Sequence, residues 1–442
     1  MKTYKKLKFV ELRELGFWDT KRYLNISDKK FKNNITLSDV LIPYKKRISK
    51  REMIEKKYAI ISKINFGGEL FLRDLNNIEN YKGDIYLVPD NSIIYSKINV
   101  KHGCIFYNDK ENTPFGVSSE YPIFTFDNTI VSGKFLQKLL RTQEFKKLLD
   151  SKATGISKAR VKQADFLATR VPLPPLSEQE TIVKNYYDKI TQATTYEQQA
   201  ETLEKNIENY LFESLGIEEL DKRKKIGLNI IESKRMERWD IPFLMGESSL
   251  KSKYSIHRMG EYIVEIATGT TPPTSRKEYF RGDINFYTPS DINNKILLNA
   301  DRKVSLLAVK DKKVRVFKKN TLLFVGIGST VGKVGIIGNE FATSNQQITG
   351  FNVDENMLLT EYVYYYFTYF KNVTTKEQTK ATLPIVNQEK IMNILIPIPP
   401  KETQQAIINQ IDTYKNEIKI LRERATLLKQ QAEQEFEQTI FS

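Results

Sequence analysis

Two stretches decide the architecture of this chain: Pro172-Leu173-Pro174-Pro175-Leu176-Ser177-Glu178-Gln179-Glu180 and, 225 residues later, Pro397-Ile398-Pro399-Pro400-Lys401-Glu402-Thr403-Gln404-Gln405. Each is a proline-rich leader that favours extended backbone and releases the following residues to start a helix. We expect Ser177 and Thr403, or the residues beside them, to cap that start. Glu180 follows Ser177 at capping-box spacing.

The run after each leader has apolar residues spaced alternately four and three apart, the pattern of a coiled-coil seam. Lys189 is the one interruption, in the first copy. A seam must face a partner, and the other copy is available in the same chain, so we predict that the two helices pair. The alternative is two unrelated amphipathic helices packed on separate cores. The seam residues are Ile182, Tyr186, Ala193, Tyr196, Ala200, Leu203, Ile207, Tyr210, and Ile407, Ile411, Tyr414, Ile418, Leu421, Ala425, Leu428, Ala432.

The composition is that of a folded protein with room for several cores. The 442 residues suffice for two or three domains, and 40% are hydrophobic and 11% aromatic. Cys104 is the single cysteine, so no intramolecular disulfide can form and an intracellular setting is favoured. No apolar run approaches membrane-spanning length and no signal-peptide core follows Met1, so we expect a soluble, cytoplasmic protein without membrane contacts.

The net charge of +15 is unevenly distributed. Residues 1–170 carry a net charge of +14 and residues 236–396 carry +5, whereas residues 171–235 and 397–442 carry −3 and −1. The positive charge therefore lies in the two large segments between the helical repeats. This partition indicates two polyanion-binding modules on a nearly neutral frame. A generally lysine-rich proteome is the alternative, but it does not explain the near-neutral helices.

The second large segment repeats the first at offsets near 225 residues, which is typical of a domain duplication. We predict a module at 1–170, a helix and linker at 171–235, a second module at 236–396 and a second helix at 397–442. The linker includes Asp221-Lys222-Arg223-Lys224-Lys225. Corresponding segments are Phe17-Trp18-Asp19 and Arg238-Trp239-Asp240, Ile93-Ile94-Tyr95 and Leu322-Leu323-Phe324-Val325, Ser118-Ser119-Glu120 and Thr343-Ser344-Asn345, Ala153-Thr154 and Ala381-Thr382.

Local patterns in the first module predict a mixed α/β structure. Residues 58–62 and 93–98 have strand composition, and Gly67-Gly68 and Gly83-Asp84 mark turns. Residues 133–149 form one amphipathic helical pattern.

A glycine-rich stretch, Phe324-Val325-Gly326-Ile327-Gly328-Ser329-Thr330-Val331-Gly332-Lys333, resembles several cofactor loops superficially. A phosphate loop needs glycine at position 327 and a hydroxyl residue at 334, and neither is present. The dinucleotide pattern fails because Gly332 comes one residue late. We predict instead a tight turn whose backbone and Lys333 approach a phosphate backbone.

We find no catalytic constellation in the sequence. Asp311-Lys312-Lys313 offers a local nuclease-like triplet without a carboxylate partner. His102 and His257 are the only histidines, so a histidine-based metal site or triad has no support.

Groups that suit nucleic-acid recognition are better represented. Amides bond bidentately to adenine and arginine to guanine, while lysine and hydroxyl groups suit phosphates. For any one of these stretches, ordinary solvated surface is the alternative. The candidate DNA-binding residues are Lys45, Lys46, Arg47, Arg51, Lys97, Asn99, Lys101, Lys158 and Arg160 in the first module, and Thr270, Thr271, Thr274, Arg276, Lys277, Tyr279, Ser290, Lys333, Ser344, Asn345, Gln346 and Gln347 in the second.

With these motifs in place, the chain resembles the specificity subunits of type I restriction–modification systems. The duplicated leaders with their helices carry the resemblance, together with residues 269–291 and the Gly328-to-Gly335 run followed by Thr343-Ser344-Asn345-Gln346-Gln347. It covers essentially the full length. It is specific in the second half and weaker in the first, where residues 96–103 replace the glycine run.

The resemblance implies an α+β fold: two pseudo-repeated α/β target-recognition domains separated by two long helices that form an antiparallel coiled coil. Each domain would read half of a split double-stranded DNA target. Methyltransferase subunits, and a motor–nuclease subunit for restriction, would dock on the frame. Adenosylmethionine, ATP and magnesium would belong to those partners, so this chain would need no cofactor. A helix of about 39 residues spans roughly 58 Å and could act as a ruler between the contact sites.

Two other functions stay open at this point. The chain could be a self-contained DNA methyltransferase or nuclease, or a basic coiled-coil adaptor that binds nucleic acid or acidic protein without sequence preference. Methyl transfer by the purified chain alone would favour the enzyme. Salt-dependent binding with no preferred duplex would favour the adaptor.

Overall fold

The computed structural model describes residues 34–73, 81, 83–109, 114–152, 160–217, 250–374 and 384–441. The chain divides into two compact units: Met1–Glu197 with Arg422–Ser442, and Gln198–Leu421. Each unit therefore contains a module and parts of both long helices. The following predicted features lie outside the described residues: Phe17-Trp18-Asp19, Ala153-Thr154, Lys158, Asp221-Lys222-Arg223-Lys224-Lys225, Arg238-Trp239-Asp240 and Ala381-Thr382.

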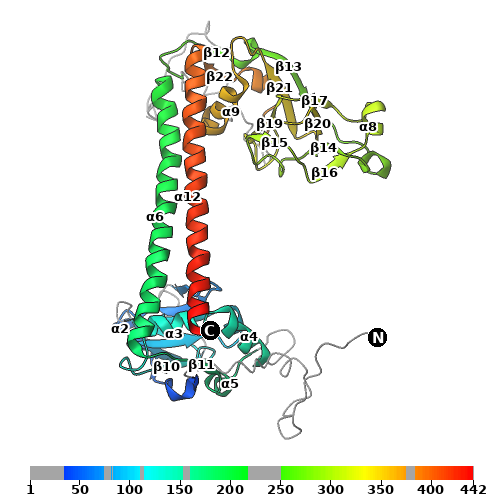
Figure 1. Ribbon diagram of the computed structural model, residues 1–442. Helices are drawn as coiled ribbons and strands as arrows, with labels where there is room; N and C mark the ends of the chain where they lie inside the picture. Colours follow the sequence, from blue (N-terminus) through cyan, green and yellow to red (C-terminus); the bar gives the residue numbers. More distant parts are fainter. Residues whose placement is uncertain are drawn as a thin grey trace, which may run out of the picture. The chain divides into compact units, whose positions relative to one another are not determined.

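The first module contains two sheets and a two-stranded ribbon (Figure 1). One sheet has the order β2-β10-β7-β8 with antiparallel neighbours, and the other has the order β3-β6-β9-β4-β5, in which β4 and β9 are parallel. The strands are β1 Asn34–Thr36, β2 Ile42–Tyr44, β3 Arg47–Ile48, β4 Ile60–Ile64, β5 Leu70–Arg73, β6 Ile85–Val88, β7 Ser92–Tyr95, β8 Ile105–Asn108, β9 Phe115–Val117, β10 Ile123–Thr125 and β11 Arg170–Pro172. The helices are η2 Leu37–Asp39, α2 Lys50–Glu55, η4 Val100–His102, α3 Gly133–Leu139, α4 Gln143–Lys152 and α5 Gln163–Leu167.

The second module also contains two sheets and a ribbon. Its sheets have the orders β13-β21-β18-β19-β15 and β16-β14-β20-β17. The strands are β12 Ile256–Arg258, β13 Ile263–Thr268, β14 Ile284–Tyr287, β15 Ile296–Leu297, β16 Arg302–Val304, β17 Val316–Lys318, β18 Leu322–Val325, β19 Val334–Ile337, β20 Phe341–Ser344, β21 Ile348–Val353 and β22 Leu395–Pro397. The helices are η6 Met259–Glu261, η7 Lys277–Phe280, α8 Leu306–Lys310, α9 Thr360–Tyr369, α10 Lys371–Thr374 and α11 Gln388–Met392.

The two modules share one topology. The order β2-β10-β7-β8 recurs as β13-β21-β18-β19, and β6-β9-β4-β5 recurs as β17-β20-β14-β16. The single parallel pair of the second sheet recurs at the same place, as β4 with β9 and as β14 with β20. Strands β7 and β18 therefore hold equivalent positions, which confirms the predicted correspondence of residues 93–95 with 322–325. A duplicated sequence that has drifted still specifies one fold twice.

The predicted helix at 133–149 is wrong in one respect, because it is two helices. The Thr142 hydroxyl donates to the Leu139 carbonyl at 2.7 Å and accepts from the Phe145 amide at 3.3 Å. A threonine that bonds the local backbone in this way ends one helix and starts the next. Both helices still bury the predicted apolar face, including Phe135 and Leu149.

Aromatic side chains connect each module to its proline leader. In the first module Tyr95 stacks on Phe166 of α5, with ring centroids 4.3 Å apart. In the second, the buried Tyr362 and Tyr366 of α9 donate hydroxyl hydrogen bonds to the carbonyls of Pro397 and Leu395, at 2.8 and 2.9 Å. Strand β22, which begins the second leader, is therefore fixed to the core of its module.

The long helices are α6 (Leu176–Leu215) and α12 (Lys401–Phe441), and their predicted seams are buried or half-buried throughout. In the first unit, Lys189 pairs with Glu435 at 2.7 Å and Glu197 with Lys429 at 2.8 Å, so the helices run antiparallel (Figure 1). In the second unit Tyr210 of α6 meets Tyr414 of α12, with ring centroids 6.2 Å apart. The pairing of the two copies is confirmed, and the interrupting Lys189 is neutralised by an ion pair.

Buried glutamines fix the start of both long helices, and one of them, Gln404, is beside the predicted cap residue Thr403. Ser177 and Thr403 lie inside the first turn, because the helices begin at Leu176 and Lys401. Gln179 and Gln404 are each 0% exposed. Gln179 donates to the Ile130 and Pro174 carbonyls and accepts from the Ser132 amide, at 2.8–3.0 Å.

Gln404 repeats these three bonds in the second module. It donates to the Met357 and Pro399 carbonyls and accepts from the Leu359 amide, at 2.8–2.9 Å. Ser132 and Leu359 are the residues that precede α3 and α9. Gln179 therefore ties α6 and its leader to the start of α3, and Gln404 ties α12 and its leader to the start of α9.

Candidate nucleic-acid interface

A junction of three segments recurs at the end of strand β7 in the first module and of β18 in the second. In the first module the Lys97 amide donates to the Glu120 carbonyl, and the Lys97 carbonyl accepts from the Val161 amide, both at 3.1 Å. In the second module Gly326 makes the same two bonds, to Gln347 and from Val386, both at 2.8 Å. Each junction brings together the loop after β7 or β18, the loop before β10 or β21, and the segment before α5 or α11.

The glycine-rich stretch forms a tight hairpin turn between β18 and β19, as predicted. The Val331 amide donates to the Gly328 carbonyl and the Gly332 amide to the Val325 carbonyl, at 3.2 and 3.0 Å. Gly328 and Gly332 have φ angles of +111° and +90°, which disfavour residues with a Cβ atom. At Gly326 a Cβ atom would collide with the Val386 carbonyl.

Amide and hydroxyl side chains gather at the second junction. The Asn345 amide donates to the Gln347 side chain at 2.9 Å, and the Thr271 hydroxyl donates to the exposed Gln346. Lys333 Nζ lies 3.1 Å from the Asn293 side-chain oxygen, and Asn293 in turn donates to the Ser290 carbonyl. The structure therefore brings together six of the predicted residues: Thr271, Ser290, Lys333, Asn345, Gln346 and Gln347.

A half-buried ion cluster anchors the loop that carries Ser290 and Asn293. Lys295 lies 2.9 Å from carboxylate oxygens of both Glu361 and Asp412, on α9 and α12. Burial opposes protonation of Lys295, but the hydrogen bonds that its ammonium group donates to the two carboxylates outweigh this effect and raise the pKa of Lys295. Lys415 lies beside the cluster, and burial together with the charge of Lys295 lowers the pKa of Lys415.

Four other predicted residues, Thr270, Thr274, Arg276 and Lys277, lie along the same loop as Thr271. The Arg315 amide donates to the Thr270 hydroxyl at 2.7 Å, which brings Arg315 against that loop. Thr274, Arg276 and Lys277 are exposed. Arg276 pairs with Glu278 at 2.8 Å, and the pKa of Glu278 is lowered by a backbone hydrogen bond and by this arginine.

Two predicted DNA contacts in this module are corrected by the structure. Tyr279 and Ser344 are both 0% exposed. Tyr279 packs in a hydrophobic cluster with Phe286, and its hydroxyl donates to Asp311 at 2.9 Å. Ser344 lies against Gly269, where a side chain on the glycine would collide with it. Both residues support loops and neither presents its side chain at the surface.

Among the predicted residues of the first module that the structure describes, Lys97 and Arg160 lie at the junction. Lys97 Nζ donates to the Ser119 carbonyl at 2.6 Å, and Arg160 lies 3.4 Å from the Glu120 carboxylate. Asn99 precedes η4. Lys101, on η4, pairs with Asp150 at 2.8 Å.

Four further predicted residues, Lys45, Lys46, Arg47 and Arg51, lie on or beside the edge strand β3. Lys45 lies over the Tyr86 ring, with Nζ 5.1 Å from the centroid. Arg47 pairs with Asp84 at 2.5 Å and Arg51 with Glu55 at 2.9 Å. Lys46 is exposed, and its carbonyl accepts from the Leu87 amide.

A second contact between loops, which the sequence reasoning missed, lies next to each junction. In the first module the β4–β5 turn packs against the loop that contains η4: the Phe66 and His102 ring centroids are 5.0 Å apart. Arg141 donates to the Gly103 carbonyl at 3.2 Å and also to the Gly67 carbonyl. In the second module the equivalent contact is that of Asn293 with Lys333. The Gly67-Gly68 turn was the available signal, but it does not reveal what the turn packs on.

In the part of the chain that the structure describes, no three His, Cys, Asp or Glu side chains are grouped to hold a metal ion. Burial raises the pKa of the Cys104 thiol to about 11, which leaves little thiolate at neutral pH. The helices within the described ranges are all too short or too polar to cross a membrane.

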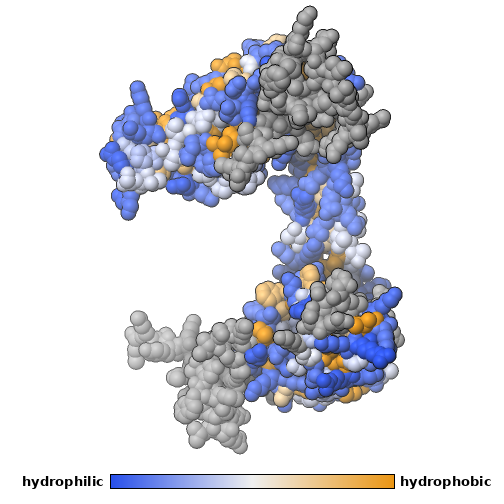
Figure 2. Space-filling model, turned by 180° about the vertical axis from the view of Figure 1, so that it is seen from behind, coloured by the Kyte–Doolittle hydropathy of each residue, from blue (hydrophilic) through white to orange (hydrophobic). Residues whose placement is uncertain are grey.

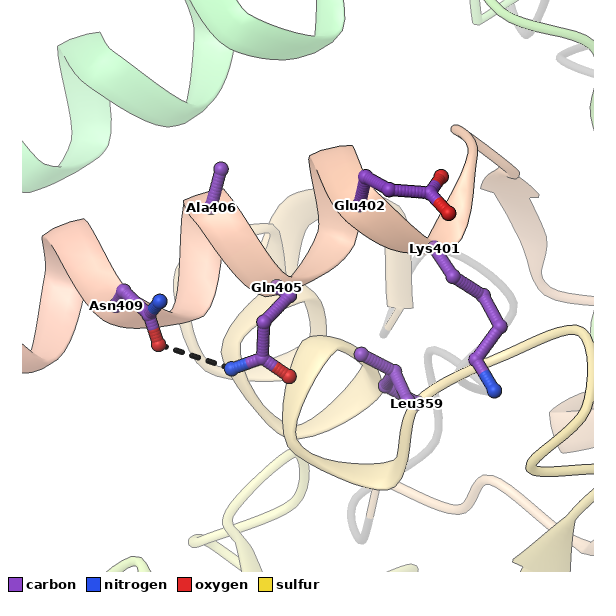
Figure 3. A pocket seen from close by; sticks show the side chains of 6 residues that line it. All are labelled: Leu359, Lys401, Glu402, Gln405, Ala406 and Asn409. Atoms are coloured by element: carbon purple, nitrogen blue, oxygen red, sulfur yellow. Dashed lines mark hydrogen bonds between the residues drawn. The ribbon is translucent and has the colours of Figure 1, made fainter.

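A pocket in the second unit lies where α12 begins, away from the junction. Leu359, Lys401, Glu402, Gln405, Ala406 and Asn409 line it (Figure 3). Gln405 donates to Asn409 at 2.9 Å along the helix.

Comparisons with known proteins cover the second module best. Residues 254–430 match the family model described as "Type I restriction modification DNA specificity domain". The MjaIX type I restriction enzyme specificity subunit of Methanocaldococcus jannaschii is 33% identical over 153 residues, which are 33% of this chain and 34% of that protein. The MjaX specificity subunit of the same organism is 22% identical over 269 residues, which are 61% of this chain and 57% of that protein. The alignments thus span about a third and 57% of these relatives' own lengths.

A solved structure extends the likeness in fold to nearly the whole chain. It comes from work on complex assembly and conformational transition of the type I R-M system, and it has a TM-score of 0.61 and 16% identity. The alignment covers 92% of this chain and 98% of that chain. This confirms the fold that the resemblance implies for nearly the whole chain, while the family match itself covers residues 254–430.

Proposed function

We propose that this chain, whose residues 254–430 belong to the type I restriction–modification DNA specificity domains, is a specificity subunit that recognises a bipartite double-stranded DNA target. The repeated three-segment junction carries the proposal. One fold presents the same three segments twice, and each time exposed basic, amide or hydroxyl groups lie on them. Two copies of a reading module in one chain suit a target made of two half-sites.

The chemistry of the second junction favours base recognition in addition to phosphate binding. The exposed Gln346 and the neighbouring Asn345 carry the amides that bond bidentately to adenine. Lys333, Thr271 and the hairpin backbone lie beside them and suit phosphate oxygens. The first junction offers Lys97 and Arg160 instead, so we expect it to read a different half-site.

The proposal assigns no catalytic step to this chain. Methylation, and cleavage where a motor–nuclease subunit is present, would belong to partner subunits docked on the frame. The long helices support this role: the exposed faces of α6 and α12, away from the seam, are polar over most of their length (Figure 2). That the helix pair also sets the spacer between half-sites stays a prediction.

Methylation sequencing of cells with and without this chain, in the presence of its methyltransferase partners, tests the proposal. We expect an adenine-methylated bipartite motif only when the chain is present. Replacing residues 236–396 with the second module of a related chain should change one half of the motif. Identical methylomes with and without the chain would contradict the proposal.

Two controls separate the other candidate functions. Incubation of the purified chain with DNA and labelled adenosylmethionine should give no methyl transfer, and transfer without partners would show a self-contained enzyme. Binding to duplexes of unrelated sequence with equal affinity, at every salt concentration and with partners present, would favour an adaptor.

A further inference from the structure

The tip of the β4–β5 hairpin in the first module presents a large aromatic side chain to solvent. Phe66 is 62% exposed, although it belongs to a module whose other phenylalanines are mostly buried. Its ring contacts the His102 imidazole, with centroids 5.0 Å apart and planes inclined by 40°. The residue is thus held against a neighbouring loop without being part of a hydrophobic core.

The backbone beneath this ring is tightly fixed. Arg141, at the end of α3, donates to the carbonyls of Gly67 and Gly103, one from each loop. Gly68 and Gly103 have φ angles of +78° and +89°, so both turns adopt conformations that favour glycine. Phe66 and His102 are therefore presented by two turns that the structure locks to each other.

The second module places its own candidate contacts at the equivalent position. The β14–β16 connection corresponds to the β4–β5 turn, and the β18–β19 turn corresponds to the β7–β8 connection, because the strand orders coincide. In the second module these connections meet through Asn293 and Lys333, at 3.1 Å. Where that module has an amide and an ammonium group, the first has a phenyl ring and an imidazole.

The surroundings of Phe66 suit a duplex better than an apolar protein partner. Lys101 lies on η4, and the Lys146 side chain passes close to Gly103. Nearby carboxylates are engaged: Asp150 pairs with Lys101, and Glu69 accepts from Asn65. Most of the described surface visible in Figure 2 is hydrophilic. The same hairpin also exposes Phe71 and Leu72 on β5, so Phe66 is one of three exposed apolar side chains beside these basic groups. Such a small apolar group suits a base edge within a surface whose lysines suit phosphates.

We propose that Phe66 is a specificity-determining residue of the first module, and that its ring contacts a thymine methyl group in the half-site read by that module. An apolar side chain recognises thymine through this methyl group, which marks the major-groove edge of an A·T pair. His102 positions the ring through the loop contact. The inference rests on the proposed function, because it requires that the first module reads DNA.

The test uses the full chain assembled with its methyltransferase partners. Methylation sequencing first defines the two half-sites. Duplex probes then carry deoxyuridine in place of each thymine of the two half-sites in turn, which removes only the methyl group. For the natural chain we expect one such substitution to weaken binding about fourfold, the effect of losing one buried methyl-sized contact.

The variant Phe66→Ala should bind the thymine and deoxyuridine probes equally, because the contact is already gone. Phe66→Leu should retain part of the discrimination. Phe71→Ala provides a matched control on the same hairpin: Phe71 is 42% exposed on β5, beneath Lys63, and its removal should leave discrimination unchanged. Thermal unfolding of Phe66→Ala should match the natural chain, since the ring is exposed.

The outcomes separate this inference from the proposed function. If the natural chain directs no bipartite methylation, the proposed function fails. If it does, but Phe66→Ala keeps the discrimination of the natural chain, or no thymine of either half-site discriminates, only the role of Phe66 is overturned.

Discussion

The two modules share the hydrogen bonds that hold their loops in place, and they differ in the side chains that those loops present. The buried glutamine, the three-segment junction and the strand order recur in both. The loops that meet beside the junction do not: Phe66 and His102 occupy the place of Asn293 and Lys333. Hydrogen bonds that position a loop are thus retained after duplication, while the groups available to a ligand have changed.

The turns that follow β7 and β18 show how the same backbone hydrogen bonds can support different loops. In the second module it is a glycine hairpin in which Gly326 packs directly against the Val386 carbonyl. In the first module Lys97 makes the same backbone bonds, and its side chain turns to the Ser119 carbonyl. The first module then continues into the short helix η4. The same three-segment junction therefore supports two turns of different conformation.

Removal of the buried glutamines should have the largest effect on the shared architecture. Gln404→Ala leaves the Leu359 amide and the carbonyls of Met357 and Pro399 without their partner, and we expect a loss of about 3 kcal/mol in the second unit. Gln179→Ala should cost as much in the first. Because the chain has two units, hydrogen exchange of α9 and α3 amides should be measured in preference to one global transition.

Gln405→Ala is the matched control for this pair. Gln405 is exposed next to Gln404, and it donates only to Asn409 on the same helix. Its replacement should change the opening free energy of α9 by less than about 0.5 kcal/mol. Equal effects of Gln404→Ala and Gln405→Ala would mean that the repeated glutamine does not fix the helix start.

Gly326→Ala should break the equivalence of the two junctions. The added Cβ atom meets a backbone carbonyl that cannot move aside freely, so we expect a destabilisation of about 1–3 kcal/mol and weaker recognition of one half-site. Lys97→Ala, at the equivalent place, should leave the fold intact because a Cβ atom is already accommodated. Thermal unfolding and binding to each half-site separately would check both variants.

Gln346→Ala should show whether the second module recognises a single base through this side chain. The Gln346 side chain is exposed and accepts a hydrogen bond from the exposed Thr271, so the fold should tolerate the change. Losing one amide contact to a base should relax discrimination at one position by roughly 10-fold, in the second module's half-site only. A methylome with the same motif as the natural chain would exclude Gln346 from base recognition.

The smallest expected effect concerns the seam. Lys189 is the only charged residue at a seam position of α6, and it pairs with the largely exposed Glu435. Such pairs contribute less than about 1 kcal/mol, so Lys189→Ala should be nearly neutral. Lys189→Leu should restore the apolar pattern and raise the unfolding temperature slightly. A clear loss of stability in Lys189→Leu would show that the ion pair sets the register of the helices.

The repeats, the seam and the hairpin turn followed from the sequence because each depends on local spacing. The misses depend on long-range packing. Tyr279 lies in a polar, basic stretch, and nothing local shows that η7 turns its ring into a core. Gln179 and Gln404 sit in the quoted leaders, but their burial follows from helices α3 and α9, which are 47 and 45 residues away along the chain. The contact of Phe66 with His102 was not predicted, because Gly67-Gly68 indicates a turn but not the loop against which the turn packs.

The C-terminal part of α12 follows the second module in the sequence but packs into the first module. Phe436 and Ile440 belong to the first module's hydrophobic core, with Phe436 beside Phe135 at a centroid distance of 5.9 Å. A nonsense mutation that removes Arg422–Ser442 would therefore injure the first module, although it leaves the coding sequence of both modules whole. In a genetic screen, lesions at opposite ends of the reading frame would fall into one phenotypic class.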